Sequence, residues 1–352
     1  MKDKNIIKKI GLPRIIIMLF IVVLFAVGAA VGVDLKKSFI DVLNRFGMNA
    51  ILVLAMIPMI QSGCGLNFGL PVGLIGGMLG AAISVEFRLQ GFAGVMAAMG
   101  MGIVFGGFFG WLYGFILNKV KGDEMIIATY VGYSFFALMN IFWIILPFRN
   151  PEVVMGFNGE GLRVTISLAE TWDKAISKLF AIPFGTAGAE TGAQLYIPVG
   201  MFIVFAIFAF LVWMYFKSKS GSAMTAVGSN PNYARAAGIN TNKYRSLSVI
   251  MSSALGAAGM VVYQQAFGFV QMYNSPLAFA FPSVAAILLG GASINKANVL
   301  NVIIGALLFQ AILTMTPTVI NTAIQVDISE VLRLIISNGL IVYALTRKGV
   351  DQ

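Results

Sequence analysis

Few side chains in this sequence are suited to covalent or metal chemistry. The 352 residues contain no histidine and one cysteine, Cys64. Histidine is the usual general acid–base group and, together with cysteine, the usual ligand of zinc and related metals. A single cysteine also excludes an intrachain disulfide. We therefore expect no catalytic residues, no metal site and no cofactor in this chain.

The chemistry that remains is hydrogen bonding by uncharged groups inside long apolar stretches. Residues 61–71 interrupt one such stretch with glycines and polar side chains. Unwound backbone at membrane depth is tolerated only where protein or a water-filled cavity satisfies it, so this broken segment is the first candidate for a transport path. For any single polar residue, hydrogen bonding between helices is an equally good interpretation. The candidates are Gln61, Asn67, Phe68, Thr129, Tyr133, Tyr263, Gln264 and Gln265. None is charged, which favours a neutral polar solute.

A second group of residues has the spacing of a short helix with both ends marked. Asn230 is a good N-cap, Pro231 suits the first helical position, and Gly238 suits the left-handed backbone that ends many helices. Ala234 and Arg235 lie between them. A compact helix of this kind within the polar stretch 217–245 is suited to contact with another protein. An ordinary surface helix is the plainer alternative.

The elements that must position these residues are membrane helices. The sequence is 59% hydrophobic and 11% charged, which lies far outside the range of soluble domains. Several apolar runs reach the roughly 20 residues that cross a hydrocarbon core as helix. We expect an all-α, polytopic integral membrane protein in which residues 1–352 form one transmembrane domain. Closely spaced glycines within the runs predict tight helix packing. About ten spans are predicted, with a broken helix around 61–71: 15–33, 48–66, 67–85, 92–117, 125–148, 196–216, 247–270, 277–293, 299–320 and 328–345.

The net charge of +10 is informative through its distribution along the chain. In a ten-span arrangement most of the lysines and arginines fall on the cytoplasmic side, which predicts that both termini are cytoplasmic and favours a lipid bilayer over nucleic acid as partner. Residues 149–195 then form an extracytoplasmic insert and 217–245 a cytoplasmic loop. In the insert, the apolar residues Leu168, Trp172 and Ile176 recur at helical spacing, so an amphipathic helix is expected over 168–180.

The cytoplasmic loop carries a family resemblance. Residues 226–240, AVGSNPNYARAAGIN, resemble the coupling-helix loop of ABC importer permeases of the ribose and nucleoside type. The small-residue stretch 252–260 and the turn at Gly290-Gly291 extend the resemblance, which covers 215–345 well and the first half loosely. It implies a permease of the bacterial plasma (inner) membrane that moves its solute by alternating access. It also implies an ABC ATPase subunit, a second permease copy or paralogue, and an extracytoplasmic solute-binding protein as partners. The residues implied in ATPase coupling are Asn230, Pro231, Ala234, Arg235 and Gly238.

Two features bear on where ATP is hydrolysed and which solute moves. The chain has no Gly-Lys dipeptide and hence no phosphate-binding loop, so ATP hydrolysis is expected on a separate ATPase chain. At the broken segment, ribose-type permeases carry an acidic residue where this chain has Gly65. Nucleoside-type permeases have Asn-x-Gly followed by glutamate, of which Asn67 and Gly69 are retained and the glutamate is replaced by Pro71. Both a simple sugar and a nucleoside remain open. A secondary transporter driven by an ion gradient is the alternative, although neither a midplane acid nor an inverted repeat is evident.

Overall fold

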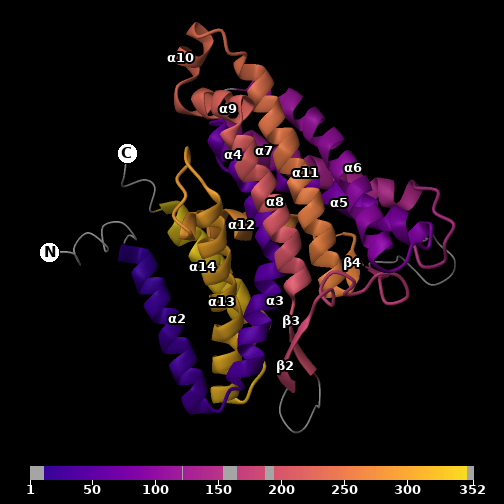
Figure 1. The fold of residues 1–352 in the computed structure, drawn as a ribbon, viewed down its shortest axis with the longest axis vertical. Coiled ribbons are helices and arrows are strands. Elements are labelled where there is room, and N and C mark those ends of the chain that lie inside the picture. Colours follow the sequence, from indigo (N-terminus) through magenta and orange to yellow (C-terminus); the bar gives the residue numbers. More distant parts are fainter. Residues whose placement is uncertain (1–11, 121, 154–164, 187–193, 274, 347–352) are drawn as a thin grey trace.

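The computed structural model describes residues 12–120, 122–153, 165–186, 194–273 and 275–346, and helices dominate it (Figure 1). Among the described residues, six helical segments are long and apolar enough to cross a membrane, and three further apolar helices are shorter. The chain is therefore a multi-pass helical membrane protein, while ten spans and cytoplasmic termini stay predictions. The helices are α2 (Leu12–Val31), α3 (Leu35–Leu54), α4 (Met56–Gln61), α5 (Leu70–Glu86), α6 (Gly91–Lys119), α7 (Glu124–Ile145), α8 (Val199–Lys217), α9 (Lys219–Ser229), α10 (Pro231–Ala236), α11 (Thr241–Phe267), α12 (Leu277–Leu289), α13 (Val299–Ile324) and α14 (Ser329–Thr346).

The helix that contains the second predicted span begins earlier than that span. A span over 48–66 was expected, but α3 begins at Leu35 and continues into α4. The reason is local, because the Asp34 carboxylate caps α3 by accepting hydrogen bonds from the backbone nitrogens of Lys36 and Lys37 at 3.0 and 3.1 Å. Arg45 therefore lies inside a helix.

Helices α5, α6 and α11 form the centre of the bundle and pack backbone against backbone. A Cβ atom on Gly76 of α5 would lie 2.4 Å from the backbone nitrogen of Gly106 in α6. A Cβ atom on Gly77 would lie 2.4 Å from the backbone oxygen of Ala257 in α11. Only glycine permits such an approach, so these two glycines pack helices as the sequence predicts.

The insert contains strands that the all-α prediction did not include. Strand β1 (Thr165–Ser167) pairs antiparallel with β4 (Phe269–Gln271), which follows α11, and β2 (Ile182–Thr186) pairs with β3 (Gln194–Ile197). The β2–β3 hairpin and α10 lie at opposite ends of the molecule (Figure 1). Part of the predicted insert, residues 154–164 and 187–193, lies outside the described residues.

The amphipathic helix expected over 168–180 was also wrong, since residues 169–180 form successive turns. Lys174 has a left-handed backbone with φ +54°, and its nitrogen donates a 2.7 Å hydrogen bond to the backbone oxygen of Gln265. Leu168, Trp172 and Ile176 are nevertheless buried. The apolar spacing predicted which residues face inward. The hydrogen bond from Lys174 to α11 favours turns over a helix for the backbone of this segment.

Candidate functional site

The predicted break in the helix is present between α4 and α5. Residues 62–69 are not helical, and Gly63 and Gly65 have left-handed φ angles of +75° and +78°. Asn67 is fully buried here; its Nδ2 donates to Ser252 Oγ of α11 at 2.7 Å, and Tyr113 of α6 donates to its Oδ1 at 3.4 Å. The side chain of Asn67 is therefore hydrogen-bonded to both α6 and α11.

Gln61 and Phe68 lie at the same break. Gln61 Nε2 donates to the backbone oxygen of Ala297, between α12 and α13, at 2.6 Å. The half-buried Phe68 ring packs against Phe281 of α12 with 5.1 Å between ring centroids. Three of the predicted path residues are thus brought together, with α6, α11 and α12 around them.

The other predicted path residues lie on α7, whose Gly132 approaches the backbone of Phe68, and near the far end of α11. Thr129 Oγ1 donates to the backbone oxygen of Met125 in its own helix, α7, and Tyr133 on the same helix is 49% exposed. Tyr263 packs its ring against Phe279 at 4.6 Å between centroids. Tyr263, Gln264 and Gln265 lie near the far end of α11, roughly 15–20 Å beyond Ser252 at 1.5 Å per residue. The predicted residues therefore form at least two separate groups.

Gln265 holds the insert onto the C-terminal end of α11. Its side chain is fully buried, and Oε1 accepts hydrogen bonds from the backbone nitrogens of Ile176 and Ser177 at 3.1 and 3.3 Å. Its Nε2 donates to Ser177 Oγ at 2.9 Å. Gln264 beside it is equally buried, yet neither amide atom has a hydrogen-bond partner among the described protein groups. The two neighbouring glutamines are therefore equally buried but differ in whether their amides are hydrogen-bonded.

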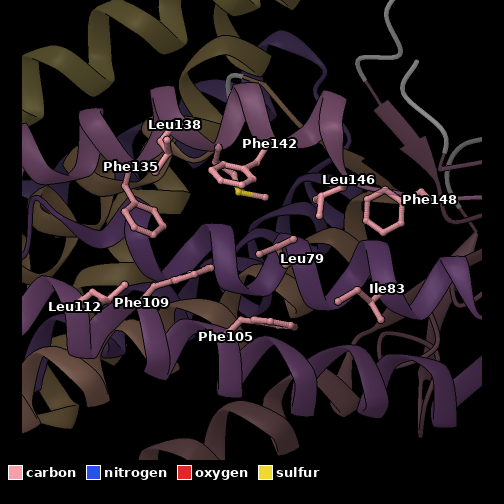
Figure 2. A pocket seen from close by; sticks show the side chains of 11 residues that line it. Leu79, Ile83, Phe105, Phe109, Leu112, Phe135, Leu138, Phe142, Leu146 and Phe148 are labelled. Carbon is pink, nitrogen blue, oxygen red and sulfur yellow. The ribbon is translucent and has the colours of Figure 1, made fainter. Parts of the chain in front are cut away.

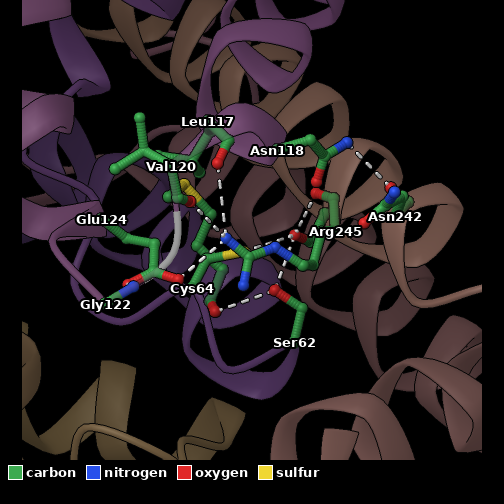
Figure 3. Close-up of polar contacts among 11 residues, drawn as sticks. Ser62, Cys64, Leu117, Asn118, Val120, Gly122, Glu124, Asn242 and Arg245 are labelled. Atoms are coloured by element: carbon green, nitrogen blue, oxygen red, sulfur yellow. Dashed lines mark hydrogen bonds and ion pairs between the residues drawn. The ribbon is translucent and has the colours of Figure 1, made fainter. Parts of the chain in front are cut away.

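At the N-terminal end of α11 an ion pair ties three helices together, and sequence reasoning missed it (Figure 3). Arg245 Nη2 lies 2.9 Å from Glu124 Oε1 at the start of α7 and 3.4 Å from the backbone oxygens of Leu117 and Val120 at the end of α6. One turn further along α11, Ser248 shares a 2.7 Å hydrogen bond with Ser62 of the break. In sequence, Arg245 reads only as one of many basic residues flanking a span.

The short helix α10 has the caps that the sequence predicts. Asn230 Oδ1 accepts hydrogen bonds from the backbone nitrogens of Asn232 and Tyr233 at 3.1 and 3.0 Å. Pro231 is the first helical residue, and Gly238 has φ +77°. Ala234 is buried, which leaves Arg235 and the 68%-exposed Tyr233 facing outward. The helix therefore presents a cation and an aromatic ring at one end of the molecule.

A cavity of about 390 Å³ lies between α5, α6 and α7 (Figure 2). Its lining is entirely apolar, from Leu79 and Ile83 on α5 to Phe142 and Leu146 at the end of α7. A polar solute would lose its hydrogen bonds to water there without replacement. The cavity is therefore unsuited to the path for a sugar or nucleoside.

Comparisons with known proteins agree on one class. Residues 38–345 match the family described as branched-chain amino acid transport system / permease component. The nucleoside ABC transporter permease protein NupB of Lactococcus lactis is 27% identical over 234 residues, covering 66% of this chain and 58% of that protein. The ribose import permease protein of Haemophilus influenzae is 24% identical, covering 82% of this chain and 80% of that protein. The galactofuranose transporter permease protein of Escherichia coli is 24% identical, with 78% and 71% covered. No solved structure matches.

Proposed function

This chain belongs to the family of branched-chain amino acid transport system permease components, and from that premise we propose that it is the membrane-spanning subunit of an ATP-binding-cassette importer. The observation that carries the proposal is α10, a two-turn helix capped at both ends whose Arg235 and Tyr233 face outward. A short, rigid, exposed helix of this kind suits docking into another protein. Its proposed partner is an ATPase on a separate chain.

The proposed solute is a polar molecule of the sugar or nucleoside class. Support comes from relatives whose names state ribose, nucleoside and galactofuranose transport. Support also comes from the break, where the amides of Gln61 and Asn67 are uncharged and are hydrogen-bonded to neighbouring elements. The solute crosses by alternating access at this segment, and the permease performs no chemistry on it.

The proposed assembly lies in the bacterial plasma membrane. Two permeases, copies or paralogues, form the path, and an extracytoplasmic solute-binding protein delivers the solute at the end that carries the insert. The ATPase contacts Asn230, Pro231, Ala234, Arg235 and Gly238 from the cytoplasm, with Arg235 as the main polar contact.

The proposal is tested in proteoliposomes that contain the permease with its co-purifying ATPase and binding protein. Arg235→Glu reverses the charge that the ATPase meets and is expected to weaken ATPase binding and abolish ATP-dependent uptake. Arg88→Glu reverses an exposed arginine at the other end of the bundle and is expected to leave ATPase binding unchanged. A cysteine at Asn232 is expected to react with a membrane-impermeant maleimide only from the cytoplasmic side. Normal uptake by Arg235→Glu would contradict the coupling role. Uptake that needs an ion gradient and no ATP would establish the secondary transporter instead.

A further inference from the structure

Helix α9, which precedes α10, touches the broken segment through two glycines. A Cβ atom on Gly228, in the last turn of α9, would lie 2.2 Å from the backbone oxygen of Gln61 and 2.8 Å from the backbone nitrogen of Gly63. A Cβ atom on Gly63 would lie 2.9 Å from the Cα of Gly228. No side chain fits between the two segments. We call this approach of backbone to backbone the glycine contact.

On the α9 side of the glycine contact, the helix is packed against its neighbours. Met224 and Val227 of α9 are buried, and α9 packs against both α4 and α11. Ser218 caps the helix by accepting a hydrogen bond from the backbone nitrogen of Gly221 at 3.2 Å. Helices α9 and α10 are joined at Asn230, which ends one and caps the other. A displacement of α10 is therefore shared by α9.

The broken-segment side is suited to change shape. Gly63 and Gly65 have left-handed backbones on either side of Cys64, and a glycine can change φ and ψ at little cost. A few such residues between rigid elements are the usual form of a hinge. Asn67, the buried side chain at the centre of the proposed path, lies two residues beyond Gly65. A rotation at the glycines would therefore move Asn67.

A second tie joins the same two regions. Ser62 Oγ and Ser248 Oγ share a 2.7 Å hydrogen bond, and Ser248 lies in α11, the helix that leaves the cytoplasmic loop. Ser62 and Cys64 lie directly beside Arg245 in this cluster (Figure 3). The chain thus meets the broken segment on both sides of α10, through Gly228 of α9 before it and Ser248 of α11 after it.

We propose that the glycine contact is where movement of α9 and α10 reaches the broken segment, and that Gly63 and Gly228 are positioning residues for transport. The inference rests on the proposed function, which makes α10 the helix that an ATPase moves. Because close-packed backbones cannot absorb a displacement as flexible side chains can, a small shift of α9 is passed on to the hinge. The residues themselves touch neither solute nor ATPase.

Gly228→Ala tests the inference by placing a methyl group where Gln61 leaves no room. Its matched control is Gly100→Ala in α6, where an added Cβ meets nothing within 4 Å. We expect Gly228→Ala to bind the ATPase and hydrolyse ATP as the unmodified complex does, while solute moved per ATP falls about tenfold, within the 5–150-fold range typical of coupling between sites. The control is expected to keep the normal ratio. A normal ratio in Gly228→Ala overturns the inference.

The labelling rate of Cys64, the single cysteine, distinguishes a role in movement from a purely structural role. Cys64 is 1% exposed and sits on the hinge, so its rate of maleimide labelling reports on the broken segment without engineered cysteines. In the unmodified complex the rate is expected to differ between the nucleotide-free state and the state trapped with ATP and vanadate. In Gly228→Ala the two rates should be equal. Equal rates in the unmodified complex would show that the segment does not move.

Ser62→Ala decides the matter if Gly228→Ala does not assemble. It removes the hydrogen bonds that join Ser62 Oγ to Ser248 Oγ and to the backbone oxygen of Met59, and it adds no atoms. We expect a loss of about fivefold in solute moved per ATP, at the low end of the same range. A normal ratio in Ser62→Ala would then overturn the inference. If no ATPase binds the unmodified permease, the proposed function is wrong. If the variants bind the ATPase, hydrolyse ATP and move the normal amount of solute per ATP, only the proposed role of the glycine contact is contradicted.

Discussion

The two ends of α11 are held by different chemistry. At the N-terminal end, charge holds the helix: Arg245 pairs with Glu124 and also reaches backbone oxygens at the end of α6. At the C-terminal end a neutral, fully buried amide, Gln265, binds the backbone of the insert. The N-terminal end lies beside the exposed α10 and the broken segment, whereas the insert covers the C-terminal end. The two ends are therefore held by separate sets of contacts.

Between its two ends, α11 is held rigidly by close packing. Close backbone packing with α5 and α6, as at Gly77 and Ala257, leaves little freedom for the helix to bend between its ends. A change made at one end should therefore have distinct local effects there, and a change that alters both ends has acted through the whole bundle. Three substitutions examine this, in order of decreasing effect.

The largest effect is expected at the ion pair. Arg245→Ala leaves the Glu124 carboxylate without its cation in a partly buried site, with side-chain exposures of 11% and 15% for the two residues. Removing one partner of such a pair costs about 3 kcal/mol. We expect a lower midpoint of thermal unfolding in detergent and faster amide hydrogen exchange at the start of α7, with exchange in the insert unchanged.

A double-substitution cycle separates the pair from general damage. Arg245→Ala with Glu124→Ala removes both charges, so it should cost less than Arg245→Ala alone. Equal costs would mean that Arg245 acts chiefly through its contacts with the backbone of α6. Faster exchange in the insert would show that the two ends are not independent.

A smaller and opposite-ended effect is expected for Gln265→Ala. It leaves the buried nitrogens of Ile176 and Ser177 without acceptors, at a cost of about 2 kcal/mol. The result should be faster hydrogen exchange and easier proteolysis over 165–186, while the start of α7 and the rate of ATP hydrolysis stay as they were. Loss of solute uptake with an intact insert would instead support the path role predicted for Gln265.

The contacts near the two ends of α11 differ in whether the sequence can predict them. The caps of α10 depend on Asn230, Pro231 and Gly238, which act within a few residues, so their types alone predict the helix. The Arg245–Glu124 pair joins residues 121 apart, and no spacing rule reaches that far. Helical periodicity fails at the insert because the backbone of Gln265, far along the chain, captures the nitrogen of Lys174.

At the break, composition was enough to predict an unwound segment but not its neighbours. Glycines and polar side chains at 61–71 indicate the interruption, and the structure places Gln61, Asn67 and Phe68 there together. The role of these residues in the path stays a prediction. The contact between this segment and α9, at Gly63 and Gly228, could not be foreseen, because a glycine that allows close approach looks in sequence like any other glycine.

The smallest effect is expected at Gln264, and its sign is opposite. This side chain is as buried as Gln265, but neither amide atom has a partner among the described protein groups. A buried amide without hydrogen bonds costs roughly 1–3 kcal/mol, and leucine has a similar volume without that cost. Gln264→Leu is therefore expected to raise the midpoint of thermal unfolding slightly and to leave uptake unchanged, in contrast to Gln265→Ala. A lower midpoint would mean that an ordered water binds the amide. A normal midpoint with reduced uptake would place Gln264 in the solute path, as its position in an apolar run predicts. It would also show that the C-terminal end of α11 opens during transport.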